Sequence, residues 1–129
     1  MTTPSVCRIA GGMLVSLVGA ALALGGIQLW RGGREAWPDI VASETTVART
    51  SSGMIVLAAF LLMAGVAAIA SVPSGCHAAA IATIVIVSAA FWANYALFGR
   101  IRPLHTGTNV IVAAIILALL WFGYDARPR

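Results

Sequence analysis

The sequence predicts an all-α integral membrane protein, a bundle of four helices that forms one domain over residues 1–129. Of these residues, 60% are hydrophobic and 9% are charged, whereas water-soluble domains have about 45–50% and about 25%. The few charges leave four long uncharged stretches, and a helix needs roughly 20 apolar residues to cross a bilayer. A net charge of +4 carried by so few groups fits the flanks of membrane spans better than a nucleic-acid interface.

Helices suit these stretches, because the stretches lack the alternation of membrane barrel strands. The expected spans are 9–30, 53–73, 78–98 and 108–124, and all eight Arg and four Asp or Glu residues fall outside them. An A-x-A pattern at 21–23 in the first span is similar to a signal-peptide cleavage site. The apolar run continues past it to Trp30, so we expect a retained span.

Three connections join the spans. The longest, 31–52, is polar, and we expect it to lie along the membrane interface with a short helix starting near Pro38. The second is a tight turn, 74–77, which makes its two helices antiparallel. In the third, 99–107, we expect Pro103 and Gly107 to block helix continuation, and Thr106 or Thr108 to cap the last helix.

The first span carries a face of small residues that predicts close helix packing. Their spacings alternate between four and three, which places them on one side of a helix. In lipid, such a stripe lets a neighbouring backbone approach closely. The stripe consists of Gly12, Ser16, Gly19, Ala23 and Gly26, and the expected facing surface on the second span consists of Ala58, Gly65 and Ala68.

The first and third connections lie on one side of the membrane and carry the candidate binding residues. Arginines beside indole rings hold anionic headgroups or the carboxylates of a partner protein. The predicted partner- or headgroup-binding residues are Trp30, Arg31, Arg34, Trp37, Arg100, Arg102 and His105.

Few residues inside the spans are expected to have a functional role. An ion-coupled transporter needs an ionisable residue near the bilayer midplane, and no Asp, Glu or Arg lies there. We expect Gln28 and Asn94 to form hydrogen bonds between helices. Cys7, Cys76 and His77 share one side of the membrane, and a Cys7–Cys76 disulfide stays open on an oxidising side. The two cysteines lack C-x-x-C spacing, so we expect no metal site. No nucleophile–base pair is visible in the sequence, so we expect no catalytic residue.

Glycine pairs end the first span: Gly25 and Gly26, then Gly32 and Gly33, followed by 37–38, Trp-Pro. This segment resembles the start of the N-terminal membrane domain of membrane-bound, pyrroloquinoline-quinone-dependent glucose dehydrogenases. The resemblance covers the first span and first connection only. The chain departs from the family by having four expected spans rather than five and by lacking the catalytic propeller, so no catalytic residue is carried over.

The resemblance implies a bacterial inner-membrane module whose first connection faces the periplasm, with ubiquinone as the implied small molecule. The positive-inside rule implies the reverse orientation, since the two longer connections hold five arginines against three elsewhere. We favour the family orientation, because an excess of two arginines is small.

The predicted function is therefore a non-catalytic membrane subunit that anchors or assists a periplasmic quinone-linked dehydrogenase. Two alternatives stay open: a structural subunit of a larger respiratory or photosynthetic complex, and a small transporter or channel for a neutral solute. The expected partners are the lipid bilayer and another protein subunit.

Overall fold

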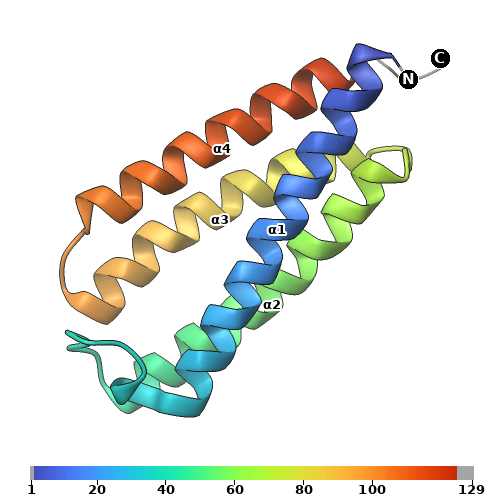
Figure 1. The fold of residues 1–129 in the computed structure, drawn as a ribbon. Helices are drawn as coiled ribbons and strands as arrows, with labels where there is room; N and C mark the ends of the chain where they lie inside the picture. The colour runs from blue at the N-terminus through green and yellow to red at the C-terminus, as the bar shows by residue number, and fades with distance from the viewer. Residues whose placement is uncertain (1, 125–129) are drawn as a thin grey trace.

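The computed structural model describes residues 2–124 and forms an all-α bundle, which confirms the predicted fold class (Figure 1). All four long helices are long and apolar enough to cross a membrane. The chain is thus a small multi-pass membrane protein whose helices contact the bilayer. In order, the elements are α1 (Thr3–Gly32), the short 3-10 helix η1 (Gly33–Glu35), α2 (Glu44–Ile69), α3 (Gly75–Phe98) and α4 (Pro103–Tyr124).

The first connection is shorter than predicted. The prediction of an interfacial loop over 31–52 is wrong for residues 44–52, which belong to α2. Helix α2 begins at Glu44 rather than at 53, because the Ser43 hydroxyl accepts a hydrogen bond from the Thr46 backbone N–H at 3.3 Å. No helix starts near Pro38, and the only helical turn between α1 and α2 is η1. The uncharged stretch marked the hydrocarbon segment, whereas the helix continues into the interface, so charged residues such as Glu44 and Arg49 lie within it.

The third connection is also shorter than predicted. Pro103 is the first residue of α4 and does not block the helix. Backbone N–H groups in the first turn have no partner within the helix, so the missing N–H of proline costs nothing there. Gly107 lies inside α4, and the Thr108 hydroxyl donates to the Leu104 carbonyl oxygen at 2.9 Å, so Thr108 is not a cap. Between α2 and α3, the turn covers 70–74, where Ser71 and Ser74 adopt left-handed φ angles of 57° and 68°.

Helices α1 and α2 pack most closely. A Cβ atom added to Gly12 would lie 2.8 Å from the Gly65 carbonyl oxygen, and one added to Gly65 would lie 2.7 Å from the Gly12 carbonyl oxygen. A Cβ atom added to Gly19 would lie 3.2 Å from the Ala58 carbonyl oxygen. The small-residue face of α1 therefore lies against α2, at backbone-to-backbone distances that only small residues permit.

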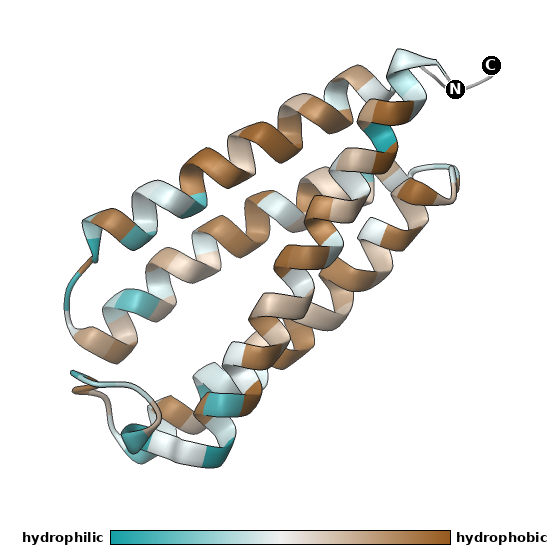
Figure 2. Ribbon diagram, in the orientation of Figure 1, coloured by the Kyte–Doolittle hydropathy of each residue, from teal (hydrophilic) through white to brown (hydrophobic). Residues whose placement is uncertain are grey.

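The bundle closes at one end and opens at the other. At the closed end, which carries the α2–α3 turn, Gly123 of α4 lies against the backbone of Arg8, and Gly11 faces Leu120. Toward the opposite end the α3–α4 pair diverges from the α1–α2 pair (Figure 1). Hydrophilic residues concentrate at that open end, and hydrophobic residues occupy most of the helix length (Figure 2). The core of the closed half consists of Val15, Leu61, Ala64, Ala68, Cys76, Ala79, Ile116 and Leu120.

Candidate functional site

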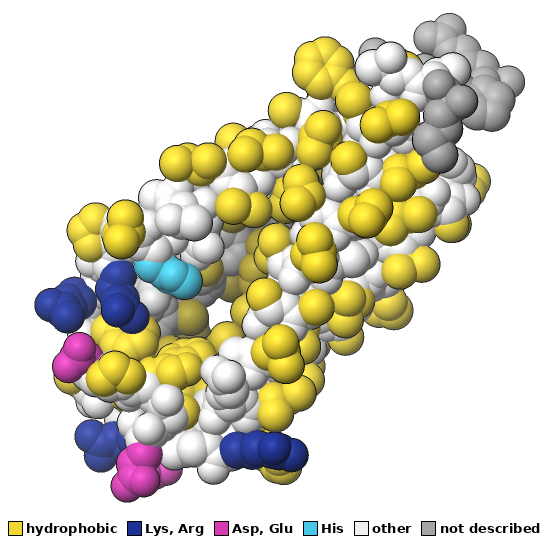
Figure 3. Space-filling view, viewed as in Figure 1, with side chains coloured by type: hydrophobic (Ala, Val, Ile, Leu, Met, Phe, Trp, Pro, Cys, Tyr) yellow, Lys and Arg dark blue, Asp and Glu magenta, His cyan; other side chains and the backbone are white. Residues whose placement is uncertain are grey.

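Charged side chains gather at the open end of the bundle, here named the charged end. In the part of the chain that the structure describes, Arg8 is the one charged residue outside it. Figure 3 shows the basic and acidic side chains around this end, with the surface hollowed between them and the middle of the bundle. The charged end contains Arg31, Arg34, Arg49, Arg100 and Arg102 together with Glu35, Asp39 and Glu44.

The α1–α2 connection is fastened to the end of α3. Backbone N–H groups of Val41 and Ala42 both donate to the Leu97 carbonyl oxygen, at 2.8 and 3.3 Å. The last carbonyls of a helix have no partner within it, so the connection satisfies one of them. Leu29, Ala42, Val47 and Leu97 form a second, fully buried core beneath this contact.

The glycine pairs of the first span have packing roles here. A Cβ atom on Gly25 would lie 3.7 Å from Cζ2 of Trp37, and one on Gly26 would lie 3.3 Å from the Ser51 carbonyl oxygen. A Cβ on Gly32 would lie 2.8 Å from that of Ala36, and Gly33 has a left-handed φ of 57°. The pairs therefore let the connection fold back and place the Trp37 ring beside α1.

A cavity of about 690 Å³ lies between the helices, beneath the charged end, and all four helices and the first connection line it. Small-molecule sites are typically about 300–1,000 Å³ in volume. The lining along α3 runs from Thr83 to Phe98, about 22 Å at the helical rise of 1.5 Å per residue. Its inner end, formed by residues such as Val18, Ile86 and Ile116, packs onto the core of the closed half.

Polarity falls along the cavity from the charged end inward. The mouth is lined by Arg49, Arg102, His105 and Trp37. Asn94 and Asn109 lie four residues inward from Phe98 and His105, about 6 Å along their helices. Deeper, the lining is almost wholly apolar, apart from Thr83, whose hydroxyl donates to the Ala79 carbonyl oxygen at 2.8 Å.

Asn94 is the polar group that stands out. Its side chain is 8% exposed, lines the cavity and forms no hydrogen bond with any described residue. Buried amides are normally paired, but the unpaired amide atoms of Asn94 are not among the fully buried polar atoms of the described residues, so they are reached from the cavity. The prediction that Asn94 bonds to another helix is therefore wrong. So is the same prediction for Gln28, which is exposed and has no such bond.

The cations at the mouth are not neutralised by carboxylates. Within residues 2–124, no ion pair joins Arg49 or Arg102 to an acidic side chain. The Arg102 guanidinium carbon lies 5.1 Å from the centre of the Phe98 ring, a cation–π contact that orients it without cancelling its charge. The mouth thus has a positive field that is open to an anion.

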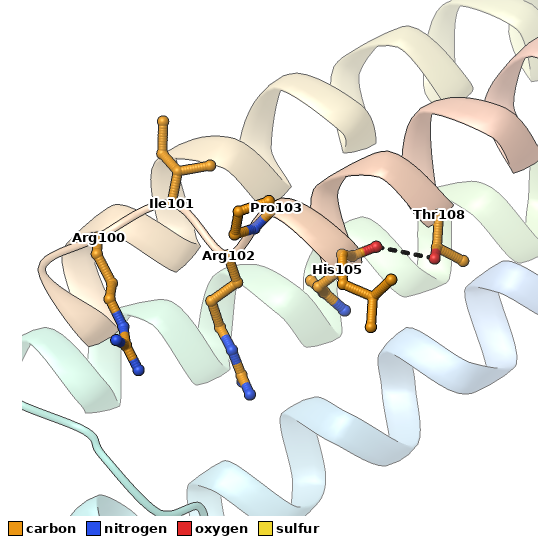
Figure 4. Close-up of a pocket in the computed structure, with 7 residues that line it drawn as sticks. Arg100, Ile101, Arg102, Pro103, His105 and Thr108 are labelled. Atoms are coloured by element: carbon orange, nitrogen blue, oxygen red, sulfur yellow. Dashed lines mark hydrogen bonds between the residues drawn. The ribbon is translucent and has the colours of Figure 1, made fainter.

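Of the predicted binding residues, Trp37, Arg102 and His105 line the cavity, and the others do not. Trp30, Arg31, Arg34 and Arg100 are exposed around the charged end. Arg100 lines a second, more open depression of about 610 Å³ at the α3–α4 turn, which shares Arg102 and His105 with the cavity. Figure 4 shows Arg100 and Arg102 pointing to the same side of that turn, with Ile101 pointing away.

The predicted site residues did not include the polar lining residues Arg49, Asn94 and Asn109. Each is a polar residue about one turn from the end of an apolar helix segment, a signal that could have singled them out. The sequence places Arg49 in the interfacial connection and predicts a helix-bridging role for Asn94, whereas no role is predicted for Asn109. Only the divergence of the helix pairs brings them to one cavity.

The closed end has different chemistry. The thiols of Cys7 and Cys76 are free, and the His77 ring makes an edge contact with the Tyr124 ring at 4.9 Å between centroids. Among residues 2–124, no group of three or more His, Cys, Asp or Glu side chains is placed to hold a metal ion. Nothing at this end adds to the site at the charged end.

No known protein family, curated protein or solved structure matches the chain. What is shown is a four-helix, multi-pass membrane protein with an interhelical cavity. The comparisons thus identify no family, and the packing of the first connection explains the positions of the glycine pairs.

Proposed function

We propose that this chain is a non-catalytic membrane subunit that anchors or assists a quinone-linked dehydrogenase of the bacterial inner membrane, with the charged end in the periplasm. The observation that carries the proposal is the charged end itself. It presents five arginines against three acids, and no ion pair joins them within the described residues. Exposed arginines beside Trp30 offer planar, bidentate donors to the carboxylates of a partner protein.

The shape of the cavity supports anchoring over passage of a solute. A channel needs a continuous path across the bundle, and the fully buried core of the closed half, including Val15 and Leu61, blocks the inner end of the cavity.

The lining of the cavity fits ubiquinone poorly. A quinone ring is neutral, and its two carbonyl oxygens need hydrogen-bond donors rather than net charge. Asn94, Arg49 and Arg102 can all supply such donors, but a neutral ring leaves the positive charges of the two guanidinium groups without a counter-ion. The proposal therefore assigns quinone reduction to the partner enzyme and gives this chain the docking role.

Copurification tests the proposal. A tagged chain is solubilised from its native membranes in a mild detergent, and proteins retained at about 150 mM salt are identified by mass spectrometry. We expect a redox enzyme with an acidic surface to be retained. Replacing the four exposed arginines by glutamine is expected to reduce its recovery about tenfold, because partner carboxylates lose their donors. The four positions are Arg31, Arg34, Arg100 and Arg102.

The matched control replaces the same four arginines by lysine. Lysine keeps the charge but loses the bidentate geometry, so we expect intermediate recovery. Recovery of the wild-type chain alone, or with proteins that carry no redox cofactor, would contradict the proposed function. Equal recovery with the glutamine variant would contradict the role of the charged end.

A further inference from the structure

We propose that the interhelical cavity binds an anionic single-chain amphiphile, with its carboxylate or phosphate at the mouth and its hydrocarbon chain directed into the bundle. This inference rests on the cavity and not on the docking of a partner enzyme. Three observations carry it: the gradient of polarity, the unneutralised cations and the unpaired Asn94 amide.

The positive charges at the mouth of the cavity favour an anionic head group. Arg49 of α2 and Arg102, next to the start of α4, both line the mouth without a carboxylate partner in residues 2–124. Both guanidinium groups are exposed, so an anion can reach them. A carboxylate or phosphate group would accept hydrogen bonds from both guanidinium groups.

Asn94 supplies the second polar contact. It lies about one turn below the mouth, and its side chain is more than nine-tenths buried and faces the cavity. The amide has no hydrogen-bond partner among the described residues and is accessible from the cavity, so it is free to bind a ligand atom. Its N–H group would donate to an oxygen of the ligand head.

The apolar interior of the cavity fits the hydrocarbon chain of the ligand. Below Asn94 the lining is made of apolar side chains from the helices apart from Thr83, over a length of about 16 Å along α3. This exceeds half of the roughly 30 Å hydrocarbon core, which is the depth that one acyl chain covers in a leaflet. The cavity therefore has room for a long hydrocarbon chain aligned with the helices.

Binding is tested with the purified chain alone in a neutral maltoside detergent, so no partner enzyme enters the measurement. The probes are oleate, 18:1 lysophosphatidic acid, oleyl alcohol and decylubiquinone, and native mass spectrometry counts the molecules retained per chain. We expect one oleate or one lysophosphatidic acid per chain, and affinities at least about tenfold weaker for both neutral probes. Tighter binding of oleate would indicate a fatty-acid carboxylate as the natural head group, and tighter binding of lysophosphatidic acid would indicate a lipid phosphate.

Two variants locate the site. Asn94→Leu keeps the branched shape of the side chain without its amide and is expected to weaken oleate binding about tenfold, while the melting temperature stays equal or rises because an unpaired amide is removed. Ala90→Phe places a ring in the cavity and is expected to abolish binding, whereas Ala114→Phe, at an exposed position of α4, leaves it unchanged.

Three results would overturn this assignment. Oleyl alcohol or decylubiquinone binding as tightly as oleate would show that the cations do not select the head. Undiminished oleate binding to Ala90→Phe would place the ligand elsewhere. A melting temperature that falls in Asn94→Leu while oleate affinity is unchanged would make Asn94 a structural residue.

Discussion

Replacing Gly65 by valine is expected to destabilise the bundle by about 3 kcal/mol. A side chain at this position of α2 meets the Ser16 hydroxyl and the Gly12 carbonyl oxygen of α1, the latter 2.7 Å from the added Cβ. The obstacle includes main chain, so no change of side-chain rotamer can relieve it. The helices must separate, and every contact along the small-residue face is weakened.

The measurement is the melting temperature of the purified protein in detergent, with Gly53→Val as the control on the same helix. A Cβ on Gly53 has no neighbour within 4 Å, so the same chemical change costs no packing there. Equal melting temperatures for the two variants would contradict the close crossing of α1 and α2.

The second large effect is expected for Gly123→Val, which acts on the contact between α1 and α4. A Cβ on Gly123 would lie 2.6 Å from the backbone N and Cα atoms of Arg8. Valine would push α4 away from α1 and open the closed end, at a cost of about 2–3 kcal/mol. Gly107→Val is the control within α4, because a Cβ there meets nothing within 4 Å.

The same thermal measurement compares Gly123→Val with its control and with the Gly65→Val, Gly123→Val double variant. The two substitutions act on different helix pairs, so their costs should add to within about 0.5 kcal/mol. A Gly107→Val variant that melts as low as Gly123→Val would contradict the closed end described here.

The helical core of the fold was predictable from the sequence, and the ends of the helices were not. Uncharged stretches locate the segments that must satisfy their backbone groups internally, so four helices follow. Where each helix ends depends on local capping, such as the Ser43 cap of α2 and the position of Pro103 in the first turn of α4. Neither depends on hydrophobicity, which explains the errors in the first and third connections.

The candidate site was predictable only in part. The arginines and tryptophans of the two longer connections are visible in the sequence, and topology alone places them at one end. The cavity depends on how the helix pairs diverge and on the docking of Val41 and Ala42 to the Leu97 carbonyl, which are tertiary contacts. A sequence pattern therefore does not reveal that Asn94 faces a cavity rather than another helix.

Cysteine labelling tests the central claim, a cation-lined cavity entered from the charged end, most directly. Asn94→Cys and Ala79→Cys are made separately in a Cys7→Ser, Cys76→Ala background, so each protein has one thiol on α3. Asn94 lines the cavity, whereas Ala79 is fully buried in the core of the closed half. We expect Asn94→Cys to react with small water-soluble methanethiosulfonates, faster with the anionic sulfonatoethyl reagent than with the cationic trimethylammonium one, while Ala79→Cys stays unreactive. Equal, negligible labelling at both positions would contradict the cavity, and faster labelling by the cationic reagent would contradict its positive mouth.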